Sequence, residues 1–546
     1  MAMRSCYGAL ASLAVALFVS AQTQPSAKPA AQAPDREAYR KAVRQKDPRE
    51  RVNWLRKFLK DYPKSSRAGA ANELILNTLV QNWPDQLPEI RDQVALMTRN
   101  ARGDDQSDKF DTVADILVTH AVLLETAQEL ERQALSRFHE KRYLAKLKRE
   151  YAEAKVPISP AALQREGDQE QASLLTTMGR IQVARGDTAA GRDLLEQAYK
   201  LDPANSDAAA ALGEIALHAG RDSAALDLLT NAQLVGKLTP EQRKDLQDLY
   251  LKLHAGAPVE LDAWLDRQYR QKFPESFHIE RYHAPVETGK TVLAELFTGA
   301  GCPPCAGFDV AMDATMERYS ERDLAVLMYH EHVPKPDPLA NPATVQRSSF
   351  YNIPGTPTLA IDGETVSSGG DREAARSIYE RFLPKIDAEL KTSPELSLAV
   401  SASREGERVT VQARVDPLSH SSKSMRLEIV LAEKQVRYSG ENGIRFHPMV
   451  VRAMAGDGAN GFAVDSSGAR TYDASFDVAQ LSADLKSYLE NYEVENDRFG
   501  PIRFSEKKYS IAIENIAIVA FVQDADTKRV LEATYVEPDA PRSLAR

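Results

Sequence analysis

The pattern of hydrophobic and polar positions changes twice along the chain, so it predicts three successive kinds of structure. Over residues 36–256, apolar positions recur every three or four residues, as in amphipathic helices. Residues 289–392 alternate between short apolar runs and helical patterns, which indicates an α/β domain. Over residues 393–546, apolar and polar residues alternate singly, as in half-buried strands of an all-β sandwich. We expect a multidomain protein in which residues 257–288 form a polar linker.

The helical segment contains an internal repeat of 34 residues, in which Gly179 returns as Gly213. This period, with small residues where paired helices approach closely, resembles tetratricopeptide repeats in units near residues 173–205 and 206–240. Such helix pairs stack into an α-helical solenoid with a concave surface. A protein partner could bind there, or the helices could only support the rest of the chain or mediate dimers. The repeat alone leaves these alternatives open.

Two cysteines stand where a predicted strand, residues 291–297, gives way to a predicted helix, residues 306–319. A cysteine at a helix N-terminus is favoured as the thiolate, because the helix dipole and unpaired N–H groups support negative charge. We expect Cys302 to be the exposed nucleophile and Cys305 the buried resolving thiol, acting through a mixed disulfide at Cys302. The two intervening prolines have no N–H, so the nearest donor in the motif is the Cys305 N–H.

About fifty residues further on, Thr356-Pro357 precedes a short apolar strand. The first strand, the Cys-Pro-Pro-Cys motif and this Thr-Pro pair together resemble the thioredoxin-like superfamily, nearest to its bacterial envelope thiol–disulfide oxidoreductases. The resemblance implies that Pro357 is cis and lies against the dithiol, and that Thr356 pairs with an extended substrate segment. It also implies protein dithiols or disulfides as substrates, with Cys302 and Cys305 as the catalytic pair and no cofactor.

The chain departs from that family at two positions near the motif. Gly301 replaces the tryptophan that usually precedes the first cysteine, and Leu296 stands where the family has a buried proton-relay acid. The adjacent Glu295 is the remaining candidate for the relay, although strand alternation turns it to the other face of the sheet. Proton transfer to Cys305 is therefore not assigned by the resemblance.

His330 and His332 follow the second predicted strand, residues 324–329, and lead into a predicted loop with four prolines up to residue 342. Beyond that loop, residues 358–366 predict a hairpin, and Asp371 caps a predicted final helix that reaches residue 390. Active sites of open α/β sheets lie at the carboxyl ends of strands, so both histidines could form a wall of the site. The alternatives are solvated loop histidines, or a copper site shared with the cysteines, since thiolates select Cu(I). A closed structural zinc site needs four ligands, and the sequence has no second cysteine pair, so we expect no metal.

The N-terminus has the pattern of an exported protein. Residues 1–21 read as a signal peptide and residues 22–35 as a flexible leader rich in Pro, Ala and Gln. An uncleaved membrane anchor is the alternative, but the apolar stretch is shorter than the roughly twenty residues that a membrane span needs. Cys6 would leave with the signal, so the mature chain would retain only the Cys302–Cys305 pair. We expect the protein in the periplasm or cell envelope, or secreted, with no membrane span after signal removal.

The predicted function is therefore that of an exported thiol–disulfide oxidoreductase, with a tetratricopeptide-like half, a thioredoxin-like domain and a β-sandwich tail. The net charge of -9 is spread along the chain and there is no basic stripe interleaved with aromatics, so nucleic acid is not an expected partner. Two alternatives stay open. The protein could be an envelope interaction scaffold with a non-catalytic thioredoxin fold, or it could handle copper.

Overall fold

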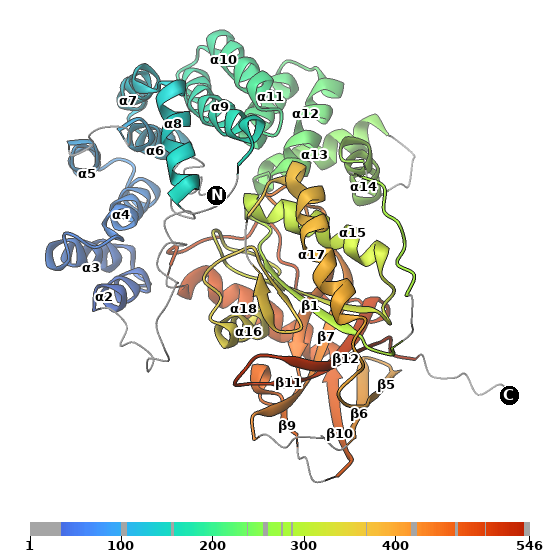
Figure 1. Ribbon diagram of the computed structural model, residues 1–546. Coiled ribbons are helices and arrows are strands. Elements are labelled where there is room, and N and C mark those ends of the chain that lie inside the picture. Colours follow the sequence, from blue (N-terminus) through green and yellow to red (C-terminus); the bar gives the residue numbers. More distant parts are fainter. Residues whose placement is uncertain are drawn as a thin grey trace. The chain divides into compact units, whose positions relative to one another are not determined.

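The computed structural model describes residues 34–99, 106–153, 158–236, 238–254, 260–274, 277–284, 288–366, 369–416, 423–464, 468–496 and 498–539 (Figure 1). The predicted signal peptide and all but the last two residues of the predicted leader lie outside these ranges. Those two residues, Pro34 and Asp35, begin a helix. The chain forms two compact units. The first contains the chain up to Ala263 and also the segment Glu490–Ser505, and the second contains Trp264–Leu489 and the chain from Glu506 onward.

The first unit is helical, as the 3.6-residue pattern predicts. Its helices are α2 (Pro34–Val43), α3 (Pro48–Asp61), α4 (Ala68–Asn82), α5 (Leu87–Arg99), α6 (Gln106–Thr119), α7 (Leu124–Arg137), α8 (Glu140–Glu153), α9 (Pro160–Ala184), α10 (Thr188–Leu201), α11 (Ser206–His218), α12 (Asp222–Val235) and α13 (Pro240–Leu253). A further helix, α14 (Leu261–Lys272), lies within the predicted linker. The segment 257–288, which we expected to be a polar linker, therefore includes a helix of 12 residues.

The repeated glycines mark the closest approach within each helix pair. A Cβ added at Gly179 in α9 would lie 2.7 Å from Leu195 of α10, and one added at Gly213 in α11 would lie 2.8 Å from Leu229 of α12. Those distances are shorter than van der Waals contact, so both positions exclude a larger residue. The 34-residue period in the sequence thus corresponds to the same packing contact made twice.

The second unit is built on a large sheet with the strand order β12-β11-β7-β8-β2-β1-β3-β4, in which β9 also pairs with β7. A smaller sheet has the order β10-β6-β5. The strands are β1 (Val292–Thr298), β2 (Leu324–His330), β3 (Thr358–Ile361), β4 (Glu364–Val366), β5 (Leu398–Glu405), β6 (Arg408–Val415), β7 (Met425–Arg437), β8 (Phe446–Met454), β9 (Phe462–Ala463), β10 (Arg470–Asp477), β11 (Ile516–Asp524) and β12 (Val530–Val536).

The prediction of a separate all-β sandwich at residues 393–546 is wrong on two points. β8 pairs with β2 in parallel at Met328 and Val450, so the C-terminal strands extend the sheet that begins with β1. The same segment also contains α18 (Val478–Glu495), a helix of 18 residues. No boundary at residue 392 separates two sheets, and the unit is a mixed, β-rich domain.

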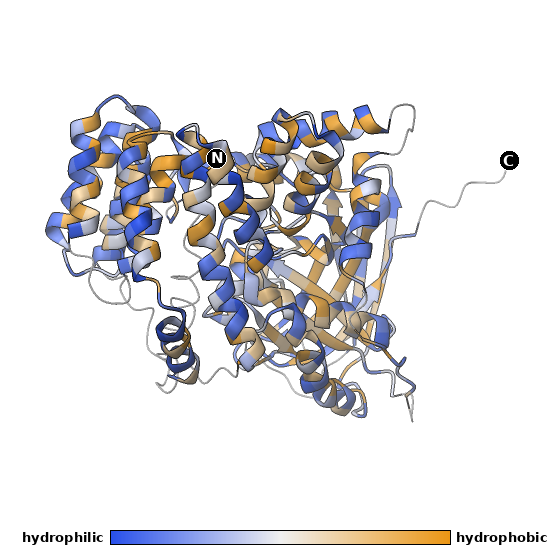
Figure 2. Cartoon of the chain, turned by 90° about the horizontal axis from the view of Figure 1, so that it is seen from above, coloured by the Kyte–Doolittle hydropathy of each residue, from blue (hydrophilic) through white to orange (hydrophobic). Residues whose placement is uncertain are grey.

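Helices cover the sheet and bring the cysteine segment to it. α15 (Ala306–Arg318) packs beside α17 (Ala375–Glu389), as Figure 1 shows, and α16 (Pro342–Tyr351) contacts β2 and β8. The central strands are coloured as hydrophobic in Figure 2, in agreement with the complete burial of β1 and β2. Sequence patterns predicted α15, α17 and the β3–β4 hairpin, but α16 lies in a segment that we expected to be a loop.

Candidate active site

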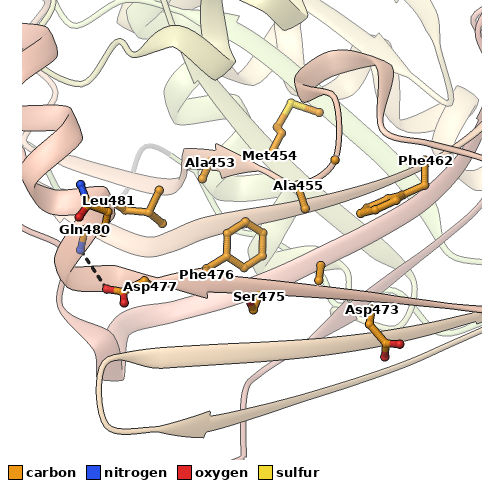
Figure 3. A pocket seen from close by; sticks show the side chains of 12 residues that line it. Ala453, Met454, Ala455, Phe462, Asp473, Ser475, Phe476, Asp477, Gln480 and Leu481 are labelled. Atoms are coloured by element: carbon orange, nitrogen blue, oxygen red, sulfur yellow. Dashed lines mark hydrogen bonds between the residues drawn. The ribbon is translucent and has the colours of Figure 1, made fainter.

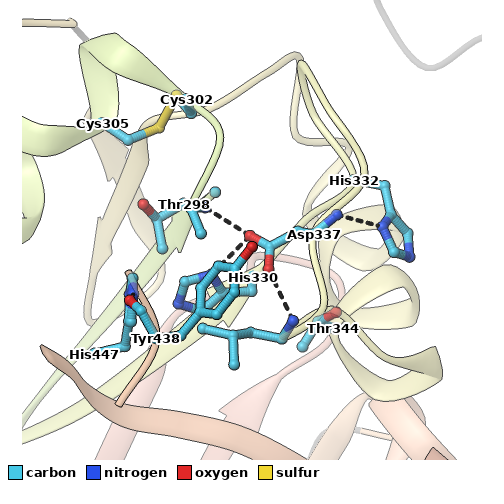
Figure 4. Close-up of polar contacts among 12 residues, drawn as sticks. Thr298, Cys302, Cys305, His330, His332, Asp337, Thr344, Tyr438 and His447 are labelled. Carbon is cyan, nitrogen blue, oxygen red and sulfur yellow. Dashed lines mark hydrogen bonds and ion pairs between the residues drawn. A yellow bond between two sulfur atoms is a disulfide. The ribbon is translucent and has the colours of Figure 1, made fainter. Parts of the chain in front are cut away.

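Cys302 and Cys305 are joined by a disulfide at the start of α15, with their Cα atoms 5.3 Å apart (Figure 4). A single 3-10 turn, Pro303–Cys305, connects β1's loop to the helix. Only 1% of Cys302 and 0% of Cys305 is exposed. The expectation that Cys302 faces solvent is therefore wrong, because the segments around it close over the sulfur.

The first backbone N–H groups of the helix do not point at the sulfurs. The Cys305 N–H donates to the Cys302 carbonyl at 3.0 Å, and the Gly307 N–H donates to the Gly370 carbonyl at 3.1 Å. The Ala306 N–H donates to the Pro303 carbonyl. The oxidised pair thus gains no hydrogen bond from the helix terminus, in contrast to the role that we expected for the Cys305 N–H.

Thr356 is the residue that contacts the outer sulfur. Its hydroxyl lies 3.4 Å from Cys302 Sγ and 3.2 Å from the Val333 carbonyl, and its own carbonyl oxygen lies 3.8 Å from the same sulfur. A disulfide sulfur carries no hydrogen, so the 3.8 Å separation is a contact and not a hydrogen bond. The Thr356-Pro357 peptide bond is cis. The cis isomer agrees with what the resemblance implies for Pro357, and the residue that the structure brings to Cys302 is Thr356.

A buried polar cluster lies on the α15 side of the sheet, next to the disulfide loop. Thr298 of β1 is paired in register with His330 of β2, so both side chains lie on the same face. Thr298 donates to Asp309 of α15 at 2.7 Å, and His330 Nδ1 lies 2.9 Å from Asp337 Oδ2. Burial raises the pKa of Asp309 to about 6, against the smaller lowering effects of the Thr298 hydroxyl and of His330.

Asp337 ties this cluster to the cysteine loop. Its carboxylate accepts the Ala300 N–H at 2.6 Å and the Leu339 N–H at 2.8 Å (Figure 4). Burial acts to raise the pKa of Asp337, but His330 and these backbone donors outweigh it, so the pKa lies below its ordinary value. Asp337 therefore carries a negative charge at neutral pH, held beside His330.

His332 is buried and engaged at both ring nitrogens. Its Nδ1 accepts the Asp337 N–H at 3.0 Å, and its Nε2 lies 3.0 Å from the Tyr488 hydroxyl of α18. His330 is fully buried. The interpretation of these two residues as solvated loop histidines is wrong. The copper alternative also loses support, because His332 has no ring nitrogen left to share with the sulfurs.

A third histidine packs against the cluster. His447 of β8 lies with its ring centroid 5.0 Å from that of His330, and its Nε2 is 2.9 Å from the Tyr438 carbonyl. Burial lowers the pKa of His447 to about 3, and the neighbouring His330 acts in the same direction. His447 is therefore neutral at physiological pH and serves as a fixed wall of the cluster.

Glu295 lies apart from the cysteines. Its carboxylate accepts two hydrogen bonds from Arg347 of α16, at 2.7 and 2.9 Å, and one from the Tyr351 hydroxyl at 2.6 Å. Side chains alternate between the two faces of a strand, so Glu295 faces the side of β1 opposite to Leu296 and Thr298. The structure gives Glu295 a buried ion pair, and it does not bring this carboxylate to the cysteine face as a proton relay.

Sequence reasoning missed four residues of the cluster: Thr298, Asp309, Asp337 and Asn442. Asp309 had a recognisable signal, because it is the one acid in the first turn of α15, four positions after Cys305. Asp337 lies in a proline-rich loop, and Asn442 lies more than a hundred residues away in the connection between β7 and β8. Only the fold brings Asn442 to Asp309, at 3.1 Å.

Among the residues that the structure describes, no group of three or more His, Cys, Asp or Glu side chains is arranged to hold a metal ion. A cavity of about 410 Å³ lies elsewhere, between β8, β9, β10 and α18 (Figure 3). Its apolar lining includes Phe462, Phe476 and Leu481, and none of the predicted site residues contributes to it. The cavity is therefore separate from the disulfide.

Comparison with known families identifies part of the helical unit. A family model described as tetratricopeptide repeat matches residues 182–246, from the end of α9 into α13. This segment is therefore similar to tetratricopeptide repeats. The match covers the second predicted repeat unit and part of the first, whose packing glycines are described above. No curated protein matches the chain.

Repeats of this kind commonly mediate protein–protein contacts through the surface of stacked helix pairs.

No helix within the described ranges combines the length and apolar character required to cross a bilayer.

Proposed function

We propose that the protein is a thiol–disulfide oxidoreductase that uses the Cys302–Cys305 pair. The observation that carries this proposal is a disulfide at the start of α15 with the Thr356 hydroxyl 3.4 Å from Cys302 Sγ. A hydroxyl at that distance can donate to a thiolate on Cys302 once the pair is reduced. The mature chain would hold no other cysteine, so this pair is not one of several structural cross-links.

The exchange proceeds in two balanced steps. A thiolate of a target dithiol attacks Cys302 Sγ, the Cys302–Cys305 bond breaks, and Cys305 leaves as a thiolate that takes up a proton. The second target thiol then loses its proton and attacks the target sulfur of the mixed disulfide, which releases Cys302. The target is oxidised to a disulfide and the pair is reduced by two electrons. The reverse sequence reduces a target disulfide.

Asp309 is the group that we propose as the proton donor and acceptor for Cys305. Residues four apart on a helix share a face, so Asp309 lies one turn below Cys305 on α15. Its raised pKa of about 6 allows the carboxyl to hold or release a proton near neutral pH. This assignment replaces Glu295, which faces the opposite side of β1 from the cysteines.

A trapping experiment tests the proposal. Reduced Cys305→Ser protein, which keeps the nucleophile but lacks the resolving thiol, should accumulate a mixed disulfide with a protein disulfide substrate such as insulin. Cys302→Ser protein is the matched control and should form none. The wild-type protein should turn over the same substrate with a dithiol reductant. Absence of both trapping and turnover would reject the oxidoreductase assignment.

A second role is favoured by the tetratricopeptide match at residues 182–246. We propose that the repeats bind a protein partner, and that the thiol chemistry acts on that partner or on a protein bound with it. We also propose, from residues 1–21, that the protein is exported. Cell fractionation of the full chain would test this, and mature protein confined to the cytoplasm would contradict it.

A further inference from the structure

The connection between β7 and β8, residues 438–445, lies against the cysteine loop, and we call it the strap. Its base is closed by its own backbone, with hydrogen bonds from Tyr438 to Arg445 at 2.9 Å and from Gly440 to Ile444 at 2.8 Å. The Arg445 guanidinium is fixed to Asp266 at 2.7 Å. The base is therefore firmly held, and the tip, Glu441 and Asn442, projects toward the site.

Asn442 binds the loop that leads into Cys302. Its backbone N–H donates to the Ala300 carbonyl at 3.0 Å, and its side-chain amide donates to the Gly299 carbonyl at 3.3 Å. The same amide donates to Asp309 at 3.1 Å. The approach is close, since a Cβ added at Gly440 would lie 2.7 Å from the Ala300 oxygen. The tip thus fixes the position of residues 299–301.

Glu441 binds the other segment beside Cys302. Its carboxylate pairs with the Lys335 ammonium, and both side chains are mostly shielded from water. Lys335 in turn lies over Gly301, where an added Cβ would be 3.0 Å from the Lys335 Cβ. Val333 of the same segment accepts from Thr356, which contacts the sulfur. Two consecutive strap residues therefore hold both chain segments that flank Cys302.

A thiolate must approach Cys302 Sγ along the axis of the bond that breaks, and 1% exposure leaves no path to it. We propose that the Glu441–Asn442 tip is a latch that keeps Cys302 covered and must release before any thiol reaches the disulfide. The proposal rests on the oxidoreductase function and assigns a role to the C-terminal strands, which carry the strap.

The test measures stoichiometric reduction of the protein's own disulfide by excess dithiothreitol, with quenching by alkylation and counting of labelled thiols. Asn442→Ala removes two hydrogen bonds to the site, which together should raise the reduction rate about tenfold. Glu441→Gln removes the ion pair without touching Asp309 and should raise the rate several-fold. Asn460→Ala, at an exposed asparagine that bonds Asp457, is the matched control and should leave the rate unchanged.

Rates within twofold of wild type for both strap variants, with folding confirmed by near-ultraviolet circular dichroism, would overturn the latch. If Asn442→Ala fails to fold, Glu441→Gln decides the question alone. The assay follows only the protein's own disulfide. Faster reduction without turnover of insulin would therefore leave the latch in place and reject the oxidoreductase function, so the two failures are distinguishable.

Discussion

Asp309→Asn tests the electrostatics of the site directly, because this carboxyl is buried and its pKa is raised from 3.8 to about 6. Burial penalises the charged form, so the folded state binds this proton more tightly than the unfolded chain does. The stability that the group contributes is therefore present below pH 3.8 and is lost as the pH rises through about 6. Asparagine has no titration and removes this pH dependence.

The size of the effect follows from the two pKa values. The pKa of this carboxyl is 3.8 in the unfolded chain and about 6 in the folded protein. Raising the pH from 4 to 7 therefore lowers the free energy of unfolding of the wild-type protein by about 2 kcal/mol through this group. The variant also loses one of the two hydrogen bonds that the carboxylate accepts from Thr298 and Asn442, because asparagine has a single side-chain oxygen. That loss is the same at every pH, so the change with pH isolates the carboxyl.

The assay is urea denaturation of oxidised protein between pH 4 and pH 7, followed by tryptophan fluorescence. The chain has three tryptophans, of which Trp54 and Trp83 lie in the helical unit and Trp264 lies in the sheet-containing unit. Replacing Trp54 and Trp83 by phenylalanine leaves Trp264 as the reporter of the unit that holds Asp309. The free energy of unfolding of the variant, relative to wild type, should increase by about 2 kcal/mol from pH 4 to pH 7.

A difference between the two proteins that stays constant across this range would refute the argument, since it would mean that Asp309 titrates normally in the fold. The same variant bears on the proposed chemistry. If the carboxyl exchanges a proton with Cys305, Asp309→Asn should slow insulin reduction and remove the dependence of the rate on pH near 6.

Three further predictions concern single contacts. Thr356→Val removes the hydroxyl beside Cys302 and should slow alkylation of the reduced protein at pH 7 about threefold, because one hydrogen bond to the thiolate is lost. Gly213→Ala should lower the free energy of unfolding of the helical unit by about 1–3 kcal/mol through overpacking, whereas Gly69→Ala, with nothing within 4 Å, should not lower it. Burial raises the pKa of Glu131 well above its usual value, so Glu131→Gln should stabilise the helical unit increasingly as the pH rises above 4.5, and equal shifts at acid and alkaline pH in urea denaturation would contradict this.

The sequence predicted the elements whose signals are local. The apolar run of β1, the helix that follows the cysteines and the β3–β4 hairpin all lie within two residues of their expected bounds. α16 was missed because four prolines suggested a loop. Its start nevertheless has a local signal, since Asn341 caps the helix, Pro342 occupies its first turn and Thr344 completes a capping box.

The prediction of an all-β sandwich for residues 393–546 was wrong because the strands of this segment do not all follow one pattern of burial. β6 alternates between exposed and buried residues, as in a two-layer sandwich, but β11 is buried on both faces over Ile516–Gln523. The unbroken apolar run of β11 is typical of a central strand covered on both sides, which period-two reasoning overlooks. Strand alternation placed Glu295 on the correct face of β1, but its partner Arg347 was missed because it belongs to the helix that was not predicted.

The pairing of β2 with β8, at Met328 and Val450, determines how the protein can be divided. A chain shortened at residue 392 would lose β8 and leave one side of β2 with unpaired backbone groups, an apolar edge that invites self-association. A fragment that ends at residue 392 should therefore lack the proposed redox activity. Limited proteolysis should release the sheet-containing unit with its C-terminal strands still attached.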